Sequence, residues 1–231
     1  MITSKDNEKL KLIRKLAERK WRDREGLFVA EGEDLVAAAH AAGVKPRFVL
    51  RGGVDVEQEL LDAVSALGSG TREIGVYEQV SSTASTGLCL YLHGLGDPGN
   101  VGAIIRTVDA LVDAFVILGA GCADAHSPKS VRASMGSIFS VDVGRGEFAS
   151  LPAPRVGLVA HGGEAPDEEP LATLCVGAER EGLPREVVDA CDRLWTIPLR
   201  EGGAESLNVA AAAAIALGRI SSTALGDRGR D

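Results

Sequence analysis

Five apolar segments of strand length, separated by stretches with helical spacing, constrain the fold of this chain more than any other feature. They occupy the second part of the sequence, at residues 88–92, 114–118, 156–160, 174–176 and 194–197. Continuous apolar runs are typical of strands buried on both faces, and strands that alternate with helices usually pair in parallel. We therefore predict an α/β domain with a parallel sheet covered by helices on both sides.

The first 80 residues have a different pattern. Leu10, Ile13, Ala17 and Trp21 recur at helical spacing and predict one amphipathic basic helix over residues 7–21. Glycines and apolar patterning predict further helices at 32–42 and 57–67, with a strand at 48–50 between them. A Ser- and Thr-rich stretch at 79–87 separates this part from the apolar strands and indicates a boundary.

Two domains follow from these patterns. We expect a small domain over residues 1–80, a linker at 81–87, a larger domain at 88–222 and a disordered tail at 223–231. The last helix is expected at 206–220, where alanines predominate. Such a small-residue surface fits a helix packed flat on the sheet, and it also fits close contact with a partner subunit.

Composition narrows the class of protein. The chain has 231 residues, of which 45% are hydrophobic, and no apolar run reaches the roughly 20 residues that cross a bilayer. We expect no membrane segment and no secretory signal. The four cysteines lack CxxC spacing and three lie within or beside apolar runs, so free thiols, a cytoplasmic location and no metal site are expected.

Charge is unevenly distributed. The chain carries a formal net charge of −8, yet residues 1–25 hold nine basic and five acidic side chains. A basic segment on an acidic protein is typical of an RNA contact confined to one end, and it is equally typical of a solvated helix face. If RNA binds there, the candidate contacts are Lys11, Arg14, Lys15 and Arg22.

Three segments that follow predicted strands contain the candidate functional residues. Ligands of open α/β sheets bind at the carboxyl ends of strands. The first segment, 93–106, includes Asn100, which could cap a helix, and Arg106. The second, 127–137, places Lys129 and Arg132 near a helix start and could bind an anion. The third joins the glycine-rich residues 176–184 to 197–208.

General motifs add little. The sequence contains no GxGxxG opening a helix, no phosphate-binding GxxxxGK[ST], no HExxH and no nucleophile elbow. The four histidines are scattered, and each alone suits a structural or surface position better than a catalytic one. Dinucleotide, nucleoside triphosphate and metal-dependent chemistry are therefore poorly supported.

Taken in order, the three segments resemble the three motifs of the SpoU/TrmH family of RNA 2′-O-ribose methyltransferases, within the SPOUT superfamily. The first is similar at 97–102 and 105–107, the second at 127–129 and 132–136, and the third at 177–183, 197–198 and 205–209. Residues 11–16 and 28–32 also resemble the small, ribosomal-protein-like substrate-binding domain of many members. The resemblance covers nearly the whole chain.

The resemblance implies a carboxy-terminal α/β domain with a deep trefoil knot, a small amino-terminal α/β substrate-binding domain and a homodimer. It implies S-adenosylmethionine as cofactor and a ribose 2′-hydroxyl of structured RNA as substrate, with ribosomal RNA preferred over tRNA. A tRNA 2′-O-methyltransferase, a methyltransferase of a tRNA base nitrogen and an idle RNA-binding relative are the alternatives. The implied cofactor contacts are Gly177, Ile197 and Leu207, and the implied catalytic residues are Asn100, Arg106, Glu179, Ser206 and Asn208.

The sequence departs from the family pattern at three places, and these departures bear on how closely the cofactor would fit. Arg180 and Val112 stand where glycines are frequent, and the loop 200–203 is about one residue longer than in some relatives.

For Arg106, the role proposed within the family is that of a general base. A guanidinium seldom deprotonates in proteins, so fixing the neighbouring phosphate and stabilising developing alkoxide charge is the interpretation we favour. Lys129 and Arg132 are further candidates for RNA contact.

Overall fold

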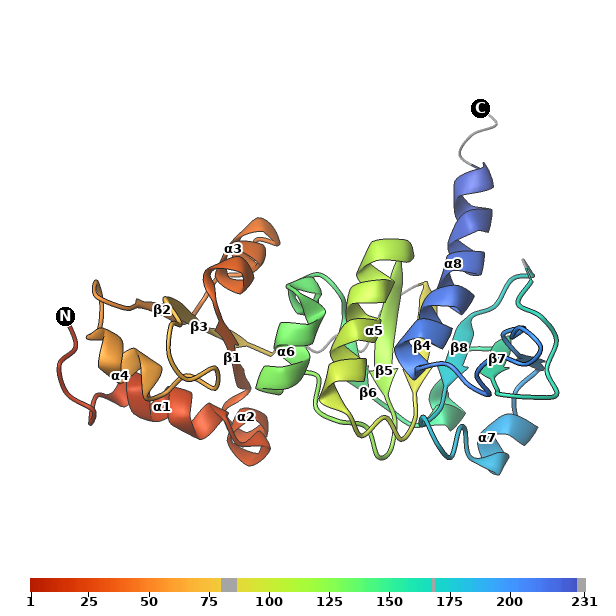
Figure 1. Cartoon of the computed structure of the whole chain (residues 1–231), viewed down its shortest axis with the longest axis horizontal. Coiled ribbons are helices and arrows are strands. Elements are labelled where there is room, and N and C mark those ends of the chain that lie inside the picture. The colour runs from red at the N-terminus through yellow and green to blue at the C-terminus, as the bar shows by residue number, and fades with distance from the viewer. Residues whose placement is uncertain (80–86, 168, 228–231) are drawn as a thin grey trace.

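The computed structural model describes residues 1–79, 87–167 and 169–227, and Figure 1 shows two sheets arranged side by side along the long axis. The amino-terminal sheet is antiparallel with strand order β1-β3-β2. The predicted linker lies outside the described residues except for Gly87. The strands and helices of the amino-terminal part are α1 (Glu8–Leu16), α2 (Arg19–Glu25), β1 (Leu27–Glu31), α3 (Glu33–Ala41), β2 (Phe48–Arg51), α4 (Gln58–Asp62) and β3 (Glu73–Glu78).

The carboxy-terminal domain is built on a six-stranded sheet with order β6-β5-β4-β8-β7-β9, in which every pairing is parallel. This confirms the predicted parallel α/β sheet. The deep trefoil knot stays a prediction. The elements are β4 (Leu88–Leu92), α5 (Pro98–Leu111), β5 (Ala114–Leu118), α6 (Pro128–Ser134), η1 (Ser137–Phe139), β6 (Val143–Arg145), η2 (Phe148–Ser150), β7 (Arg155–Leu158), β8 (Thr173–Val176), α7 (Arg185–Asp189), β9 (Arg193–Trp195) and α8 (Val209–Asp227).

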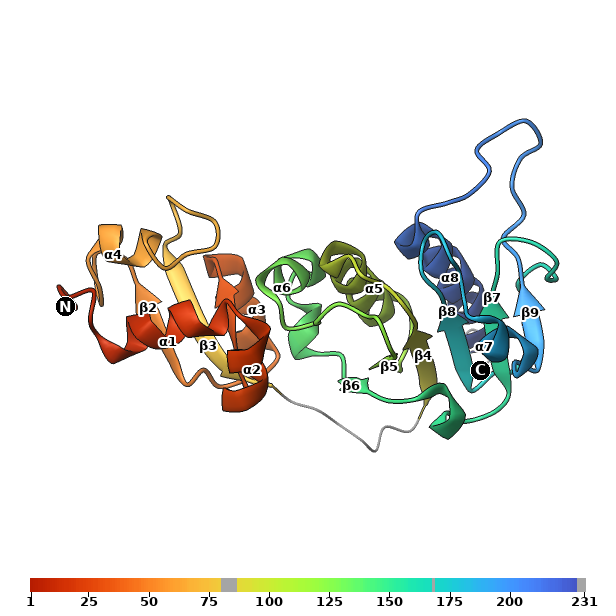
Figure 2. The same cartoon turned by 90° about the horizontal axis from the view of Figure 1, so that it is seen from below.

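Alternation along the central strands divides the core between the two faces of the sheet. Leu90 and Leu92 pack in a large cluster with residues of α5 and α8, whereas Cys89 and Tyr91 pack in a smaller one with residues near η2 and α7. Figure 2 shows α5, α6 and α8 along one side of the sheet and α7 on the other. Both faces are therefore covered, but by unequal layers.

The predicted helix over residues 7–21 is wrong in its length. Helix α1 ends at Leu16, Glu18 is extended, and α2 starts at Arg19. The break places Arg22 so that its guanidinium donates to the carbonyl oxygens of Leu16 and Ala17, each at 2.8 Å. These carbonyls at the end of α1 would otherwise lack partners, which is how the tertiary structure stabilises two short helices in place of one long helix.

Two other helices differ in length from their predicted bounds. Helix α4 ends at Asp62 rather than continuing to residue 67, because the carboxylate of Glu31 accepts hydrogen bonds from the Ser65 hydroxyl and the Ala66 backbone. Helix α8 starts later than predicted, at Val209, and runs through Asp227 into the stretch expected to be a tail. Residues 228–231 of that tail lie outside the described part.

Arg22 joins the two domains and is not an RNA contact, so that part of the sequence prediction is wrong. Its side chain is only 4% exposed, and it forms an ion pair of 2.7 Å with Asp124, whose side chain is 12% exposed. Burial disfavours ionisation of Asp124, but the His126 backbone N–H and the Arg22 guanidinium outweigh it and hold the pKa of Asp124 below its usual value. The pair is thus charged and largely removed from water.

Aromatic rings also pack across the domain interface, and one of them, the His126 ring, lies beside Asp124. Phe28 of β1 packs on the His126 ring at 4.8 Å between centroids, and Tyr77 of β3 meets Phe139 of η1 edge to face at 4.9 Å. Burial raises the pKa of Tyr77 to about 12. A Cβ atom at Gly136 would lie 2.5 Å from Cβ of Ala38, so the contact is tight. The first sheet therefore packs firmly on α6 and η1.

We expect Arg22→Met to destabilise the protein by about 3 kcal/mol, because it leaves the Asp124 carboxylate buried without a partner. Urea unfolding followed by circular dichroism measures the change. The control is Arg51→Met, which removes an exposed pair with Asp55 and should change the stability little. Equal losses in the two variants would contradict the assigned role of the buried pair.

Candidate active site

Parallel pairing brings the loops after β4 and β8 together. Leu92 pairs with Val176, and the His93 backbone donates to the Val176 carbonyl at 2.9 Å. The chain then leaves both strands at the same edge of the sheet, as the carboxyl ends of neighbouring parallel strands do. Helix α8 packs against α5 on the same side, so its amino end arrives at this edge as well.

Three predicted catalytic residues meet there. The Asn100 amide donates to the carboxylate of Glu179. The Asn208 amide donates to Oδ1 of Asn100 at 3.2 Å and to Oε1 of Glu179 at 3.4 Å. Asn208 also precedes α8 and accepts from the Ala210 backbone at 2.9 Å. These three side chains, which we call the amide–carboxylate cluster, join α5, the loop after β8 and the residue that precedes α8.

Asn100 does not cap α5, although its position suggested it could. The capping residue is Asp97, whose carboxylate accepts from the Gly99 backbone at 2.9 Å. Lys129 also binds Asp97 at 2.6 Å, and together the Lys129 ammonium and the Gly99 N–H hold the pKa of Asp97 below its usual value. The amide of Asn100 is therefore free to reach Glu179.

The second predicted segment supports α5 rather than forming an open anion site. The Ser130 hydroxyl donates to the Pro98 carbonyl at 2.8 Å. A Cβ atom at Gly102 would lie 2.3 Å from the Ser130 carbonyl oxygen, so only glycine allows this close approach of α5 and α6. Arg132 is half-buried, and its Nη1 has no hydrogen-bond partner. Lys129 is exposed and paired with Asp97, and its contact with RNA stays a prediction.

A cavity of about 290 Å³ adjoins the amide–carboxylate cluster, and Glu179 belongs to both. Its volume is at the lower end of the range for small-molecule pockets, about 300–1,000 Å³. The three predicted cofactor residues Gly177, Ile197 and Leu207 all line it, and so does Ser206. Leu158, Val176 and Leu183 add an apolar wall, while Glu179, Glu181 and Glu205 bring carboxylates to the rim.

Backbone forms much of the cavity wall. Ala178 and Gly182 exchange hydrogen bonds of 3.1 and 2.9 Å, which close the loop after β8 on itself. A Cβ atom at Gly177 would lie 2.2 Å from the Gly182 carbonyl carbon and from the Leu183 nitrogen. Exposed backbone groups beside apolar side chains suit a ligand with a flat heterocycle and a polar tail, so the cavity fits a nucleoside-containing cofactor.

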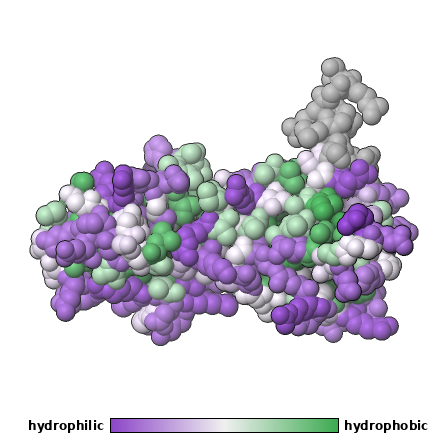
Figure 3. All heavy atoms as spheres, in the orientation of Figure 1, coloured by the Kyte–Doolittle hydropathy of each residue, from purple (hydrophilic) through white to green (hydrophobic). Residues whose placement is uncertain are grey.

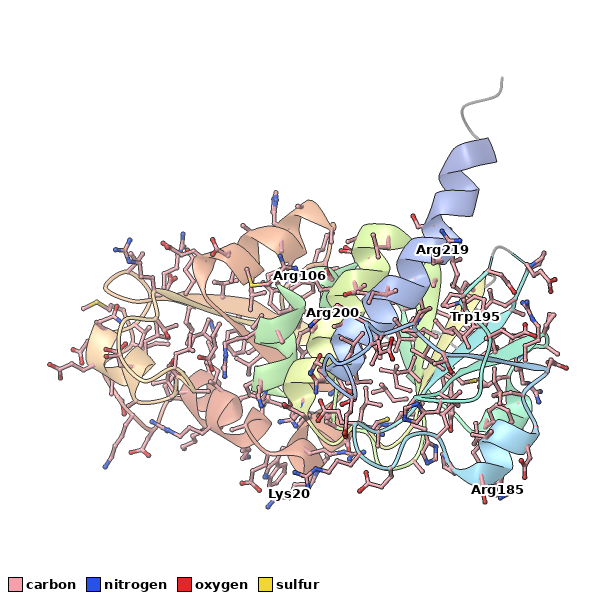
Figure 4. All side chains as sticks on the ribbon, turned by 45° about the vertical axis from the view of Figure 1, so that its right-hand side comes forward. Lys20, Arg106, Arg185, Trp195, Arg200 and Arg219 are labelled. Atoms are coloured by element: carbon pink, nitrogen blue, oxygen red, sulfur yellow. The ribbon has the colours of Figure 1, made fainter. Side chains whose placement is uncertain are left out.

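Arg106 stands apart from the other predicted catalytic residues. It lies on α5 and is exposed, and its side chain makes no hydrogen bond or ion pair with any other described residue. Figure 4 labels it together with Arg200 of the loop before α8. The structure therefore leaves the guanidinium available to a ligand, but it does not link it to the amide–carboxylate cluster.

The departures from the family pattern are compatible with this site. Val112 ends α5 in an extended conformation with φ of −144°, which any residue adopts. Arg180 is exposed at the rim of the cavity, and Gly202 supplies a positive φ of 68° in the loop at 200–203. No group of three or more metal-ligating side chains occurs among the described residues.

Sequence reasoning missed several parts of the structure that support the site. It placed no strand at β3 or β6, and it identified neither Asp97 as the α5 cap nor Asp124 as the partner of Arg22. For Asp97 a signal was available, since Pro98 is a typical first residue of a helix and Asp a typical cap. Asp124 carried no local signal, because its partner lies in the other domain.

Two family models together match most of the chain. Residues 87–218 match the SpoU rRNA Methylase family, and residues 7–87 match the MRM3-like substrate binding domain. Among curated relatives, the 23S rRNA (guanosine(2553)-2′-O)-methyltransferase of Bacillus subtilis is 32% identical over 240 residues, covering 93% of this chain and 96% of the relative.

Solved structures show the same arrangement. An AdoMet-bound rRNA methyltransferase from Sinorhizobium meliloti superposes with a TM-score of 0.81 at 27% identity, covering 95% of this chain and 96% of that one. The SpoU methyltransferase AviRb from Streptomyces viridochromogenes, in complex with AdoMet, superposes with a TM-score of 0.79 at 25% identity. The match covers 95% of this chain and 98% of that one. With its motif residues gathered at one edge of a parallel sheet, the chain belongs to the SpoU rRNA methylase family.

Proposed function

We propose that this protein transfers a methyl group from S-adenosylmethionine to a ribose 2′-hydroxyl of ribosomal RNA. The observation that carries the proposal is the amide–carboxylate cluster of Asn100, Glu179 and Asn208 beside a cavity lined by Gly177, Ile197 and Leu207. Relatives named as 23S rRNA 2′-O-methyltransferases, from Bacillus subtilis and Streptomyces viridochromogenes, support the substrate class. The amino-terminal domain would bind the RNA through exposed cations such as Lys11, Arg14 and Lys15.

The cavity would hold the cofactor through backbone around Gly177, with Ile197 and Leu207 against its apolar part. S-adenosylmethionine supplies an electrophilic methyl group on a positively charged sulfur. Carboxylates at the rim, among them Glu179 and Glu205, favour a cationic ligand by simple Coulomb attraction. The enclosed shape would fix the direction from which the ribose oxygen approaches.

The side chains around the cavity would position the ribose. The amides of Asn100 and Asn208 and the hydroxyl of Ser206 can donate to or accept from ribose oxygens without adding charge. Arg106 is a permanent cation, and it would bind the adjacent phosphate and stabilise negative charge that develops on the 2′-oxygen. Glu179 orients both amides, and acceptance of the released proton through water is the alternative that its Gln variant tests.

We further propose that the protein acts as a homodimer in the cytoplasm. On α8, Ile215 is 44% exposed beside alanines, and Leu207 just before the helix is 39% exposed. Figure 3 shows hydrophobic residues gathered over α5 and α8 on the face in view. A partner subunit covering this face would also approach the exposed Arg106. The described residues contain no helix able to span a membrane.

The homodimer is tested by sedimentation velocity. We expect the parent to sediment at twice the 24.0 kDa chain mass and Ile215→Lys to shift to a single chain, because the substitution puts a charge into an apolar contact. Val54→Lys alters a hydrophobic residue that is 62% exposed in the amino-terminal domain, between β2 and α4, and it should remain dimeric. A parent protein that is monomeric at micromolar concentration contradicts the proposal.

The chemistry is tested with radiolabelled S-adenosylmethionine and ribosomal RNA lacking the modification. Ribose methylation gives alkali-resistant dinucleotides, whereas methylation of a base nitrogen does not. We expect Arg106→Ala to slow transfer by about 100-fold or more, since one charge-stabilising donor contributes about that much. Arg106→Lys should recover only part of the parent rate of methyl transfer, because an ammonium lacks the planar, bidentate donor geometry of a guanidinium.

The control for Arg106 is Arg185→Ala, which removes a highly exposed cation on α7 and should transfer at the parent rate. If Arg106→Ala also matched the parent, the assigned role of this guanidinium would be wrong. Label recovered only in methylated bases would support the tRNA-type base methyltransferase instead. Absence of transfer together with normal RNA binding would indicate the idle relative.

Glu179 is expected to act mainly by orienting Asn100 and Asn208. Glu179→Gln keeps an oxygen that accepts from both amides, so it should stay within about 10-fold of the parent with an unchanged pH–rate profile. Glu179→Ala leaves both amides unsatisfied and should lose about 10- to 100-fold in kcat. Glu181→Gln, another carboxylate of the cavity rim, is the matched control. Equal losses in the Gln and Ala variants would show that the negative charge itself is needed.

A further inference from the structure

Trp21 is a large aromatic residue that no hydrophobic core explains. It lies on α2 and is only partly buried, and it belongs to none of the three core clusters formed by the described residues. The buried residue of α2 is its neighbour Arg22. The apolar face of α1 is complete with Leu10, Ile13 and Leu16, so the indole is not needed to cover it.

Three cations lie over the indole ring within cation–π distance. The Lys15 ammonium lies 5.0 Å from the ring centroid, the Arg24 guanidinium carbon 5.2 Å and the Lys20 ammonium 5.8 Å. Lys20 also pairs with Glu18 at 2.7 Å. Lys15 and Arg24 have no ion pair among the described residues, so their charges are available to an external anion.

An aromatic ring with unpaired cations around it matches the two parts of a nucleotide. A base stacks on the ring face, and the neighbouring phosphates meet the cations. Both faces of a base inside a duplex are already stacked, which leaves such a base no face for Trp21. We therefore propose that Trp21 is a stacking platform for an unpaired base of the substrate RNA, with Lys15 and Arg24 holding the flanking phosphates. This inference rests on the proposed function.

The position of α2 makes such a contact useful for site choice. Arg22, the next residue, holds α2 to Asp124 of the catalytic domain through a buried ion pair. A base stacked on Trp21 is thereby kept at a fixed distance from the methyl-transfer site. An unpaired base at that distance from the target ribose becomes part of what the enzyme recognises, alongside charge attraction that is independent of sequence.

The experiment measures binding of two defined probes, a short single-stranded oligoadenylate and a blunt-ended duplex RNA. The chain has two tryptophans, and Trp195 is fully buried. We expect the oligoadenylate to quench tryptophan fluorescence in the parent but not in Trp21→Phe, where only Trp195 emits. The duplex should quench little. Far-UV circular dichroism and the unfolding midpoint should not change, since Trp21 is outside the cores.

Affinity and its salt dependence separate stacking from charge. Trp21→Leu should weaken oligoadenylate binding by about 5- to 150-fold without changing the salt slope, whereas Trp21→Phe should retain most of the affinity. Lys15→Gln and Arg24→Gln should each lower the slope of log affinity against log salt by about 0.7. Arg185→Gln, a cation on α7 that Figure 4 shows well to the right of Lys20, should change neither.

The outcomes distinguish this inference from the proposed function. If Trp21→Leu bound oligoadenylate as the parent does, or if the parent showed no quenching, the stacking platform would be refuted even with full methyl transfer. If Arg185→Gln weakened oligoadenylate binding as much as Lys15→Gln, the RNA would be attracted by the overall charge of the protein and not by a defined site at Trp21. Quenching without any methyl transfer would retain the platform and remove the proposed activity.

Discussion

The parallel pairing of β4 with β8 is the constraint on which the candidate active site depends. It places two strand ends that are distant in sequence beside each other, so Asn100 and Glu179 emerge from adjacent loops. Packing of α8 on α5 then brings Asn208 to the same place. Each of the three segments alone is an ordinary polar loop. Their chemistry arises because the sheet register leaves one position at which all three can meet.

Close backbone approach is the second requirement of this arrangement. Gly102 lets α5 rest directly on α6, and Gly177 lets the loop after β8 fold back on itself beside the cavity. At both positions a methyl group would lie within 2.5 Å of backbone atoms. The helix that carries Asn100 and Arg106 is therefore held partly by main-chain contact, and the exposed Arg106 side chain stays free for a ligand.

The joint between the domains relies on a different interaction. The Arg22–Asp124 pair is buried between the two domains, and its guanidinium also caps the end of α1. A buried ion pair is weak evidence for added stability but a strong determinant of geometry, because each charge tolerates few alternative positions. This pair and the aromatic contacts across the interface, Phe28 on His126 and Tyr77 on Phe139, together hold the amino-terminal domain against the carboxy-terminal domain.

The helices and strands that could be predicted from the sequence were those marked by a pattern within the segment itself. The strands β4 and β5 were predicted at their observed bounds because they are buried on both faces and read as continuous apolar runs. The strands β1 and β3 were missed as regular elements, since their pairing is antiparallel and non-local. Strand β6 has three residues at the sheet edge and too little apolar character to be seen.

The sequence by itself determined the class of fold, the family motifs and the identity of the residues at the site, because spacing and residue type are local properties of the chain. Only the tertiary structure decided what each side chain does. Arg22 and Trp21 show this most clearly: the sequence indicated an exposed cation and a buried ring, whereas the structure buries the cation and leaves the ring partly exposed. The physical reason is that a charge is buried where a distant partner compensates it, and that partner, Asp124, is far along the sequence in the other domain.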